Sequence, residues 1–184
     1  MILATIFDKL FKDMTLTYKE YKSNLIDFKE VTKTVQYGYG DLKELNKWIR
    51  GRSGKEKYPL IWFIIESRGS GSTDYVKSNV TFYLFTSTKT SYYNNTRAEI
   101  NYSNILDPLS TQIYELILSN GSISYIYNDY EKIINTFDIP DFGLDFDDRD
   151  FVRKEEKGQK SVAIDIVDAR KLDFQARFNK NCLI

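Results

Sequence analysis

The stretch KYPLIWFIIES, residues 57–67, decides what kind of sheet this chain can form. It places eight uncharged residues, 58–65, directly after a polar loop, residues 50–57. Eight residues are too few to cross a bilayer. In a strand, the residues that point to either face would be apolar here, so both faces need cover. We therefore predict a central strand over residues 60–65, covered by helices on one face and by a further layer or a neighbouring subunit on the other.

A second apolar and aromatic run, NVTFYLFTST, spans residues 79–88. The segment between the two runs, residues 68–78, is polar and rich in Gly and Ser, which is typical of a flexible loop. We predict that the two runs pair as an antiparallel hairpin with a long tip. A tip of this length is a natural reach toward a neighbouring subunit.

A long helix and C-terminal strands complete the predicted core. The helix covers residues 96–120, because Thr96-Arg-Ala-Glu has capping-box form and Asn120-Gly121 stops it. Pro108 should kink this helix or divide it near Leu106. Residues 161–178 alternate apolar and polar side chains, which predicts two strands or one long bent strand with one exposed face.

The N-terminal part predicts a helix, an extended arm and a second, short helix. Residues 2–11 place apolar side chains at helical spacing, which favours docking on the same domain or on a neighbouring subunit over a membrane-surface anchor. Residues 16–39 are polar and β-leaning, and they predict a strand or an extended arm. Gly38 and Gly40 are interpreted as turn residues, and Asp41 as the N-cap of the short helix.

These elements together predict an α+β fold. A mostly antiparallel sheet is packed by one long helix, with helices on one face, and carries an N-terminal helix and an extended arm. We divide the chain into that helix and arm, residues 1–36, and a single α+β domain, residues 37–184.

Composition restricts the chemistry that the chain can perform. Lys plus Arg and Asp plus Glu both number 26, so no basic excess points to duplex nucleic acid. The chain has no His and one Cys, Cys182, so the commonest general base, an intrachain disulfide and a cysteine metal site are all missing. No segment predicts a membrane span. We expect no catalytic residues, no cofactor and no membrane partner.

Three groups of residues are candidates for contacts. A basic loop could touch phosphate or DNA, although a solvated loop is the favoured interpretation: Arg50, Arg52, Lys55 and Lys57. An acidic cluster could bind Ca²⁺ or Mg²⁺, although it lacks the glycine turn and final Glu of an EF-hand loop: Asp145, Asp147, Asp148 and Asp150. The predicted hairpin supplies a candidate interface between subunits: Trp62, Phe63, Arg68 and Tyr75.

Four segments carry a resemblance to a known family. They are KYPLIWFIIES, NVTFYLFTSTK, TRAEINYSNILDPLSTQIYELILSN and VAIDIVDARKLDFQARF. In order and pattern they resemble the tail-terminator and tail-completion proteins, or head–tail connector and neck-ring proteins, of long-tailed phages, including phages of Bacteroidetes-type hosts. The resemblance covers residues 37–184.

The resemblance implies a non-catalytic virion protein, present in the host cytoplasm during assembly. It would form a homo-oligomeric ring at the phage neck or tail, contact neighbouring virion proteins and could face DNA in its lumen. Two other functions stay open. One is a single-stranded nucleic-acid-binding module that uses the basic loop and the abundant tyrosines. The other is a divalent-metal-dependent enzyme built on the acidic cluster.

Overall fold

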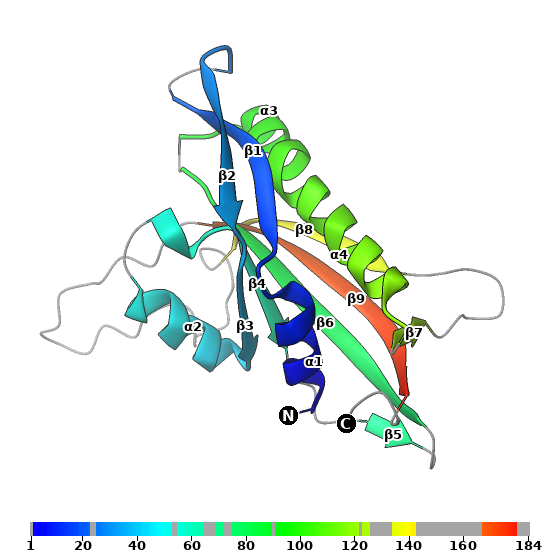
Figure 1. The fold of residues 1–184 in the computed structure, drawn as a ribbon. Coiled ribbons are helices and arrows are strands. Elements are labelled where there is room, and N and C mark those ends of the chain that lie inside the picture. Colours follow the sequence, from blue (N-terminus) through cyan, green and yellow to red (C-terminus); the bar gives the residue numbers. More distant parts are fainter. Residues whose placement is uncertain are drawn as a thin grey trace, which may run out of the picture.

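A computed structural model describes residues 2–22, 25–52, 55–64, 69–71, 75–89, 91–121, 123–125, 134–142 and 167–179. They form a seven-stranded sheet and a separate two-stranded ribbon, with helices packed on the sheet (Figure 1). Among these residues only β3 and β4 pair in parallel, and every other strand pair is antiparallel. The predicted α+β class with a mostly antiparallel sheet is therefore confirmed.

The sheet runs in the order β3, β4, β6, β9. β8 and β7 pair with successive parts of the outer edge of β9, and β5 pairs with β6. The strands are β3 (Gln36–Gly40), β4 (Leu60–Ile64), β5 (Gly69–Gly71), β6 (Tyr75–Ser87), β7 (Ile123–Tyr125), β8 (Asn135–Phe142) and β9 (Val167–Asn179). β9 is thus the single long strand predicted at the C-terminal end, where Leu172, Phe174, Ala176 and Phe178 are buried. Residues 161–166 of that prediction lie outside the described residues.

β4 is the buried central strand that its sequence predicts. Trp62 and Phe63 are each 2% exposed and belong to the cores on opposite faces of the sheet. β4 pairs antiparallel with β6, which confirms the hairpin. The loop prediction for residues 68–78 is wrong in part, because β5 forms there and β6 already begins at Tyr75, paired with β9.

Helices cover both faces of the sheet, so the expectation of one helical face is wrong. On one face, α1 (Ile2–Phe11) inserts Phe7, whose ring centroid lies 5.0 Å from that of Phe63 and 4.8 Å from that of Phe82. On the other face, α2 (Leu42–Gly51) packs its apolar side chains around Trp62. A short 3₁₀ turn, η1 (Lys55–Lys57), leads into β4.

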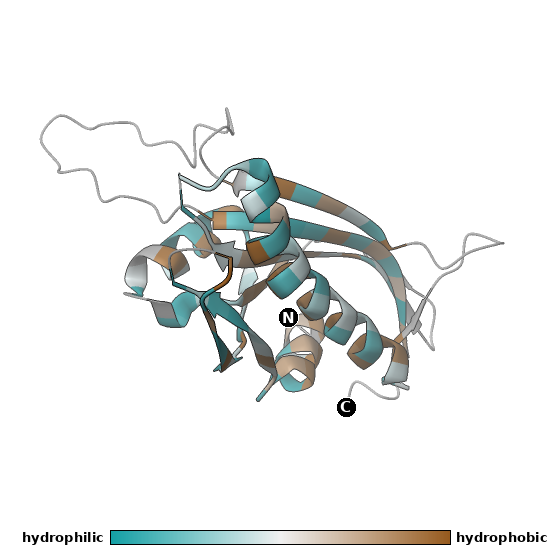
Figure 2. Ribbon diagram, turned by 90° about the horizontal axis from the view of Figure 1, so that it is seen from above, coloured by the Kyte–Doolittle hydropathy of each residue, from teal (hydrophilic) through white to brown (hydrophobic). Residues whose placement is uncertain are grey.

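The long helix beside α1 has three parts and begins earlier than predicted. They are α3 (Asn94–Arg97), η2 (Ala98–Leu106), which is π-helical, and α4 (Asp107–Ser119). The predicted capping box at Thr96 is wrong, because the helix starts at Asn94 and Thr96 already lies inside it. Hydrophilic and hydrophobic bands alternate along this helix (Figure 2).

The predicted division near Leu106 is the point where the π-helix becomes α-helix. The Asp107 N–H donates to the Tyr102 carbonyl, five residues back, which is the π pattern. Pro108 follows in the first turn of α4, where its missing N–H does least harm. Three consecutive helical elements thus stand where one long helix was predicted, and the winding changes just before the proline.

Gly38 and Gly40 are not turn residues, because both lie in β3. The Trp62 ring lies over this strand, and a Cβ on Gly38 would stand 2.4 Å from its Cζ3 atom. The Trp62 Nε1–H donates to the Gly40 carbonyl at 3.2 Å. The N-cap prediction is confirmed, since Asp41 and Glu44 form a reciprocal capping box at the start of α2. Gly38 therefore makes room for the indole, whereas Gly40 has a φ of +137° and a Cβ there would stand 2.1 Å from Glu44 Oε2.

The predicted extended arm is a two-stranded antiparallel ribbon. It consists of β1 (Thr15–Tyr21) and β2 (Phe28–Thr34), and β2 runs on into β3. The helix before it is part of the sheet's core, where Phe7 and Phe11 are 0% and 1% exposed. Docking of this helix on its own domain is confirmed, and the boundary after residue 36 stays a prediction.

Candidate interaction site at the ribbon

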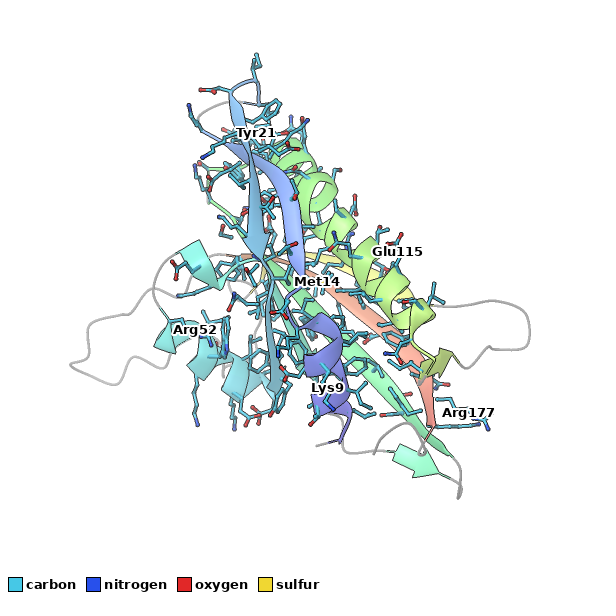
Figure 3. All side chains as sticks on the ribbon, viewed as in Figure 1. Lys9, Met14, Tyr21, Arg52, Glu115 and Arg177 are labelled. Carbon is cyan, nitrogen blue, oxygen red and sulfur yellow. The ribbon has the colours of Figure 1, made fainter. Side chains whose placement is uncertain are left out.

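The ribbon projects beyond the main sheet, with β1 next to the long helix and β2 on the outside (Figure 1). Tyr21 lies near its far end, and Met14 lies where it leaves the sheet (Figure 3). Backbone hydrogen bonds close both ends, from Val35 N–H to the Met14 carbonyl at 2.8 Å and from Lys22 N–H to the Asp27 carbonyl at 3.1 Å. The register between them is uninterrupted.

The outer edge of β1 is held by one side chain of the π-helix. Asn104 accepts from the Lys19 N–H at 3.0 Å and donates to the Lys19 carbonyl at 2.8 Å. The carboxamide therefore satisfies both backbone groups of a strand residue, as a neighbouring strand would. A single asparagine thus fixes the ribbon against the helix.

Cross-strand side chains hold the ribbon together. Lys33 Nζ lies 3.6 Å from Glu20 and over the Tyr18 ring, 5.5 Å from its centroid. Burial alone would lower the pKa of Lys33, but the hydrogen bonds and charges of Tyr18 and Glu20 outweigh it and raise that pKa above its ordinary value. The hydroxyls of Thr17 and Thr32 lie 2.8 Å apart. Pairs of this kind are the usual source of stability in a ribbon.

The tip of the ribbon is apolar and exposed. Leu25, Ile26 and Phe28 are 40%, 86% and 46% exposed. Single exposed apolar residues are ordinary, but three within four positions at the end of a projecting element form a patch that favours contact with another protein. Sequence reasoning missed these residues. The available signal was an apolar Leu-Ile pair inside an otherwise polar arm.

A groove of about 260 Å³ lies between the ribbon, the end of β6, the segment that follows it and η2. Tyrosines and lysines dominate its lining: Tyr18, Tyr21, Tyr58, Tyr92, Lys33 and Lys89. Aromatic faces and ammonium groups can stack on a base and pair with a phosphate. Lys33 is already paired with Glu20, and Lys89 lies over the Tyr92 ring, 5.5 Å from its centroid.

A buried polar network joins the helix to β9 beside this groove. The Asn101 amide donates to Thr88 Oγ1 at 2.9 Å and to Asp168 Oδ2 at 2.6 Å. Arg97 Nη1 lies 3.9 Å from Asp168 Oδ1, and Asp168 is fully buried. A carboxylate that is enclosed and hydrogen-bonded in this way positions the helix; it cannot reach a substrate in the groove.

A second network fixes the same helix to β8 and β9. Arg170 donates from Nε and Nη2 to the two Asp138 oxygens at 2.6 and 3.1 Å, and it also contacts Asp107. Its guanidinium stacks over Tyr102, 5.8 Å from the ring centroid. Burial raises the pKa of Tyr102, and the nearby Asp168 and Asp138 raise it further. Both networks are structural ties between layers.

The structure describes the side chains of two of the four residues of the predicted basic loop, Arg52 and Lys57. Arg52 stacks over the Trp48 ring, 4.3 Å from its centroid, and donates to Gln36 at 3.0 Å. Lys57 is 7% exposed. Arg50 is the penultimate residue of α2 and Lys55 begins η1, but the positions of their side chains lie outside the described residues.

The structure describes the side chains of two of the four predicted interface residues. Trp62 and Phe63 are buried inside the single chain, so neither side chain is presented to a neighbouring subunit. Arg68 lies outside the described residues, as does the side chain of Tyr75. The acidic cluster also lies outside them: Asp145, Asp147, Asp148 and Asp150. Within the described ranges, no group of three or more His, Cys, Asp or Glu side chains is placed to hold a metal ion.

Comparison with known proteins leaves the family open. No protein-family model matches the chain, and no curated protein matches its sequence. Every helix in the described part of the chain is too short or too polar to cross a membrane.

Proposed function

We propose that this chain is a structural assembly protein that contacts its neighbours through the β1–β2 ribbon. In keeping with the resemblance to phage neck and tail proteins, the assembly is a homo-oligomeric ring at the neck or tail of a phage virion. The observation that carries the proposal is the apolar patch at the ribbon tip, Leu25, Ile26 and Phe28, which projects away from a core that is already closed.

The energetics of the patch support this role. Burying a side chain such as Ile or Phe contributes about 1.5–3 kcal/mol, so covering the tip yields several kcal/mol for each contact. The ribbon is also held rigidly by Asn104 and by its cross-strand pairs, so little ordering entropy opposes docking. Association itself costs at least about 4 kcal/mol, so the tip contact would act together with other surfaces that the ring buries.

A charge introduced at the tip tests the proposal. We expect light scattering of the wild-type protein over a concentration series to give a mass above the 21.6 kDa of one chain. Ile26→Asp should shift that mass toward the monomer, because it places a carboxylate in the contact. Leu118→Asp is the matched control, since Leu118 is an exposed apolar residue on the long helix, away from the ribbon.

Two results would contradict the proposal. One is a wild-type monomer at every concentration, and the other is an equal response to the two substitutions. Negative-stain images of the large species would separate rings from open filaments. If the protein stays monomeric, salt-sensitive binding of a single-stranded oligonucleotide to the groove becomes the function to measure.

A further inference from the structure

We propose that the outer edge of β2 pairs antiparallel with the same edge of β2 in a second copy of this chain. The two ribbons would join into one continuous four-stranded sheet, with the two-fold axis at Val31. This inference rests on the proposed function, because it assumes self-assembly. It specifies, for one contact between subunits, which strand pairs, in which register and with which symmetry.

The backbone N–H and C=O groups of successive β2 residues point alternately to the two edges of the strand. In an antiparallel ladder, every second residue exchanges its hydrogen bonds with the partner strand. Val35 and Asp27 flank β2 and bond to Met14 and Lys22, which flank β1. In the continuous register between these pairs, the odd-numbered residues of β2 face β1 and the even-numbered ones face outward. Two other contacts agree with this alternation. Gln36 N–H points to the opposite edge and donates to the Pro59 carbonyl at 2.8 Å, and Lys19 turns its backbone away from β2 to Asn104.

The outward groups of β2 therefore form an open edge. They belong to Phe28, Glu30, Thr32 and Thr34, and no other strand pairs with them among the residues that the structure describes. Every residue of β2 is exposed or half-exposed. The strand contains no proline, glycine or bulge, so nothing interrupts a row of free donors and acceptors.

The other edges are covered, short or protected. Asn104 occupies the edge of β1, and β7 has three residues. β8 carries Pro140 and an irregular register between Ile139 and Phe142, both of which discourage strand addition. Within the described ranges β2 is thus the long, regular edge with no covering element, and Lys29, Glu30 and Lys33 are the charges along it. A partner edge of the same quality is the β2 strand of a second copy.

The sequence of β2 is compatible with pairing to itself. A two-fold axis at Val31 places Val31 opposite Val31 of the partner subunit, Glu30 opposite Thr32 of the partner subunit, and Phe28 opposite Thr34 of the partner subunit. Moving the register two residues toward the tip would set Glu30 against Glu30 of the partner subunit, which is unfavourable.

One cross-strand pair in this register is repulsive. Lys29 faces Lys33 of the partner subunit. Within each copy, Glu20 on β1 lies opposite Lys29 and 3.6 Å from Lys33, so its carboxylate partly neutralises these two positive charges. The paired segment ends at Thr34, because the outward N–H of Gln36 already donates to the Pro59 carbonyl. A two-fold contact joins copies in pairs, so a closed ring needs a second, different contact.

A disulfide at the two-fold axis tests the register. The variant is Val31→Cys in a Cys182→Ser background, which removes the one native thiol. In a non-hydrogen-bonded antiparallel pair the Cα atoms lie about 4.5 Å apart, within the range of a disulfide. We expect mild oxidation to give a covalent dimer on a non-reducing gel. Lys29→Cys is the control, because its two copies would lie roughly 13 Å apart, four residues at about 3.3 Å each.

Removing one outward N–H tests the edge itself. Glu30→Pro deletes a donor that β1 does not use, so the ribbon should stay folded, whereas Glu30→Ala keeps the donor and removes the side chain. We expect Glu30→Pro to shift the native mass toward the monomer and Glu30→Ala to leave it unchanged, with equal circular dichroism spectra as the check on folding.

The outcomes separate this inference from the proposed function. If the wild-type protein assembles but Val31→Cys forms no more dimer than Lys29→Cys, the edge pairing is wrong while assembly stands. An unchanged mass for a folded Glu30→Pro variant likewise overturns the edge pairing and leaves assembly intact. A wild-type monomer at every concentration overturns both.

Discussion

The main sheet and the ribbon use the same antiparallel pairing but differ in what covers them. In β4, Leu60 to Phe63 are at most 2% exposed, because helices lie on both faces. In β2, one edge and most side chains meet solvent. The sheet therefore supplies most of the stability of the folded chain, while the ribbon has exposed surface that a partner could bury.

The largest expected effect breaks the sheet. Trp62→Ala and Phe63→Ala should each lower the free energy of unfolding by about 3–5 kcal/mol, because each empties a space in one of the two cores. Chemical denaturation at fixed protein concentration measures both. Phe137→Ala is the control, since Phe137 is 53% exposed on β8, and its cost should stay within about 0.5 kcal/mol.

This experiment also tests the sequence-based interface hypothesis. If Trp62→Ala left stability unchanged but altered the native mass, Trp62 would be a subunit contact and the burial seen in the single chain would be misleading. A large loss of unfolding free energy in both variants would mean that both faces of β4 belong to the core of the single chain.

A smaller effect should loosen the ribbon alone. Asn104→Ala removes two hydrogen bonds to the Lys19 backbone, each worth about 0.5–1.5 kcal/mol. We expect amide hydrogen exchange to speed up by about tenfold or more at Lys19 and its neighbours in β1, and to stay constant in β4. Asn95→Ala, in the first turn of the same helix, is the matched control. Equal loss of protection in both regions would mean that ribbon and sheet unfold as one unit.

Patterns read within one element were predictable from sequence. Two-sided apolarity predicted the burial of β4, alternation predicted β9, and the Asp41 box predicted the start of α2. Each of these signals arises from neighbours in the same strand or helix. The class of the fold followed from the order of such elements.

Features set by contacts between distant segments were not predictable. Gly38 was mistaken for a turn residue, because only the Trp62 ring, far along the chain, explains it. The two hydrogen bonds of Asn104 depend on β1 in the same way. The ribbon tip was missed because exposure of an apolar residue is a property of the fold, and the sequence alone shows only that the residue is apolar.

The smallest expected effect lies at the junction of the two regions, where β2 runs into β3. Tyr37 donates to the Ala4 carbonyl of α1 at 3.2 Å. Burial raises its pKa above the ordinary value of 10.0, and the charges of Asp8 and Tyr39 raise it further. The folded chain thus holds the phenol proton more tightly than the unfolded chain. Stability from this group is complete below about pH 10 and is lost as the pH rises above it.

Tyr37→Phe isolates this contribution. At neutral pH the variant should be less stable by about 0.5–1.5 kcal/mol, the value of one hydrogen bond. Above about pH 10 the wild type should lose up to about 1.4 kcal/mol per pH unit relative to the variant, so the two free energies of unfolding converge. Denaturation curves from pH 7 to 11 measure both slopes. Parallel curves would mean that Tyr37 ionises freely, and the junction would then behave like the ribbon, open to solvent, rather than like the closed core of the sheet.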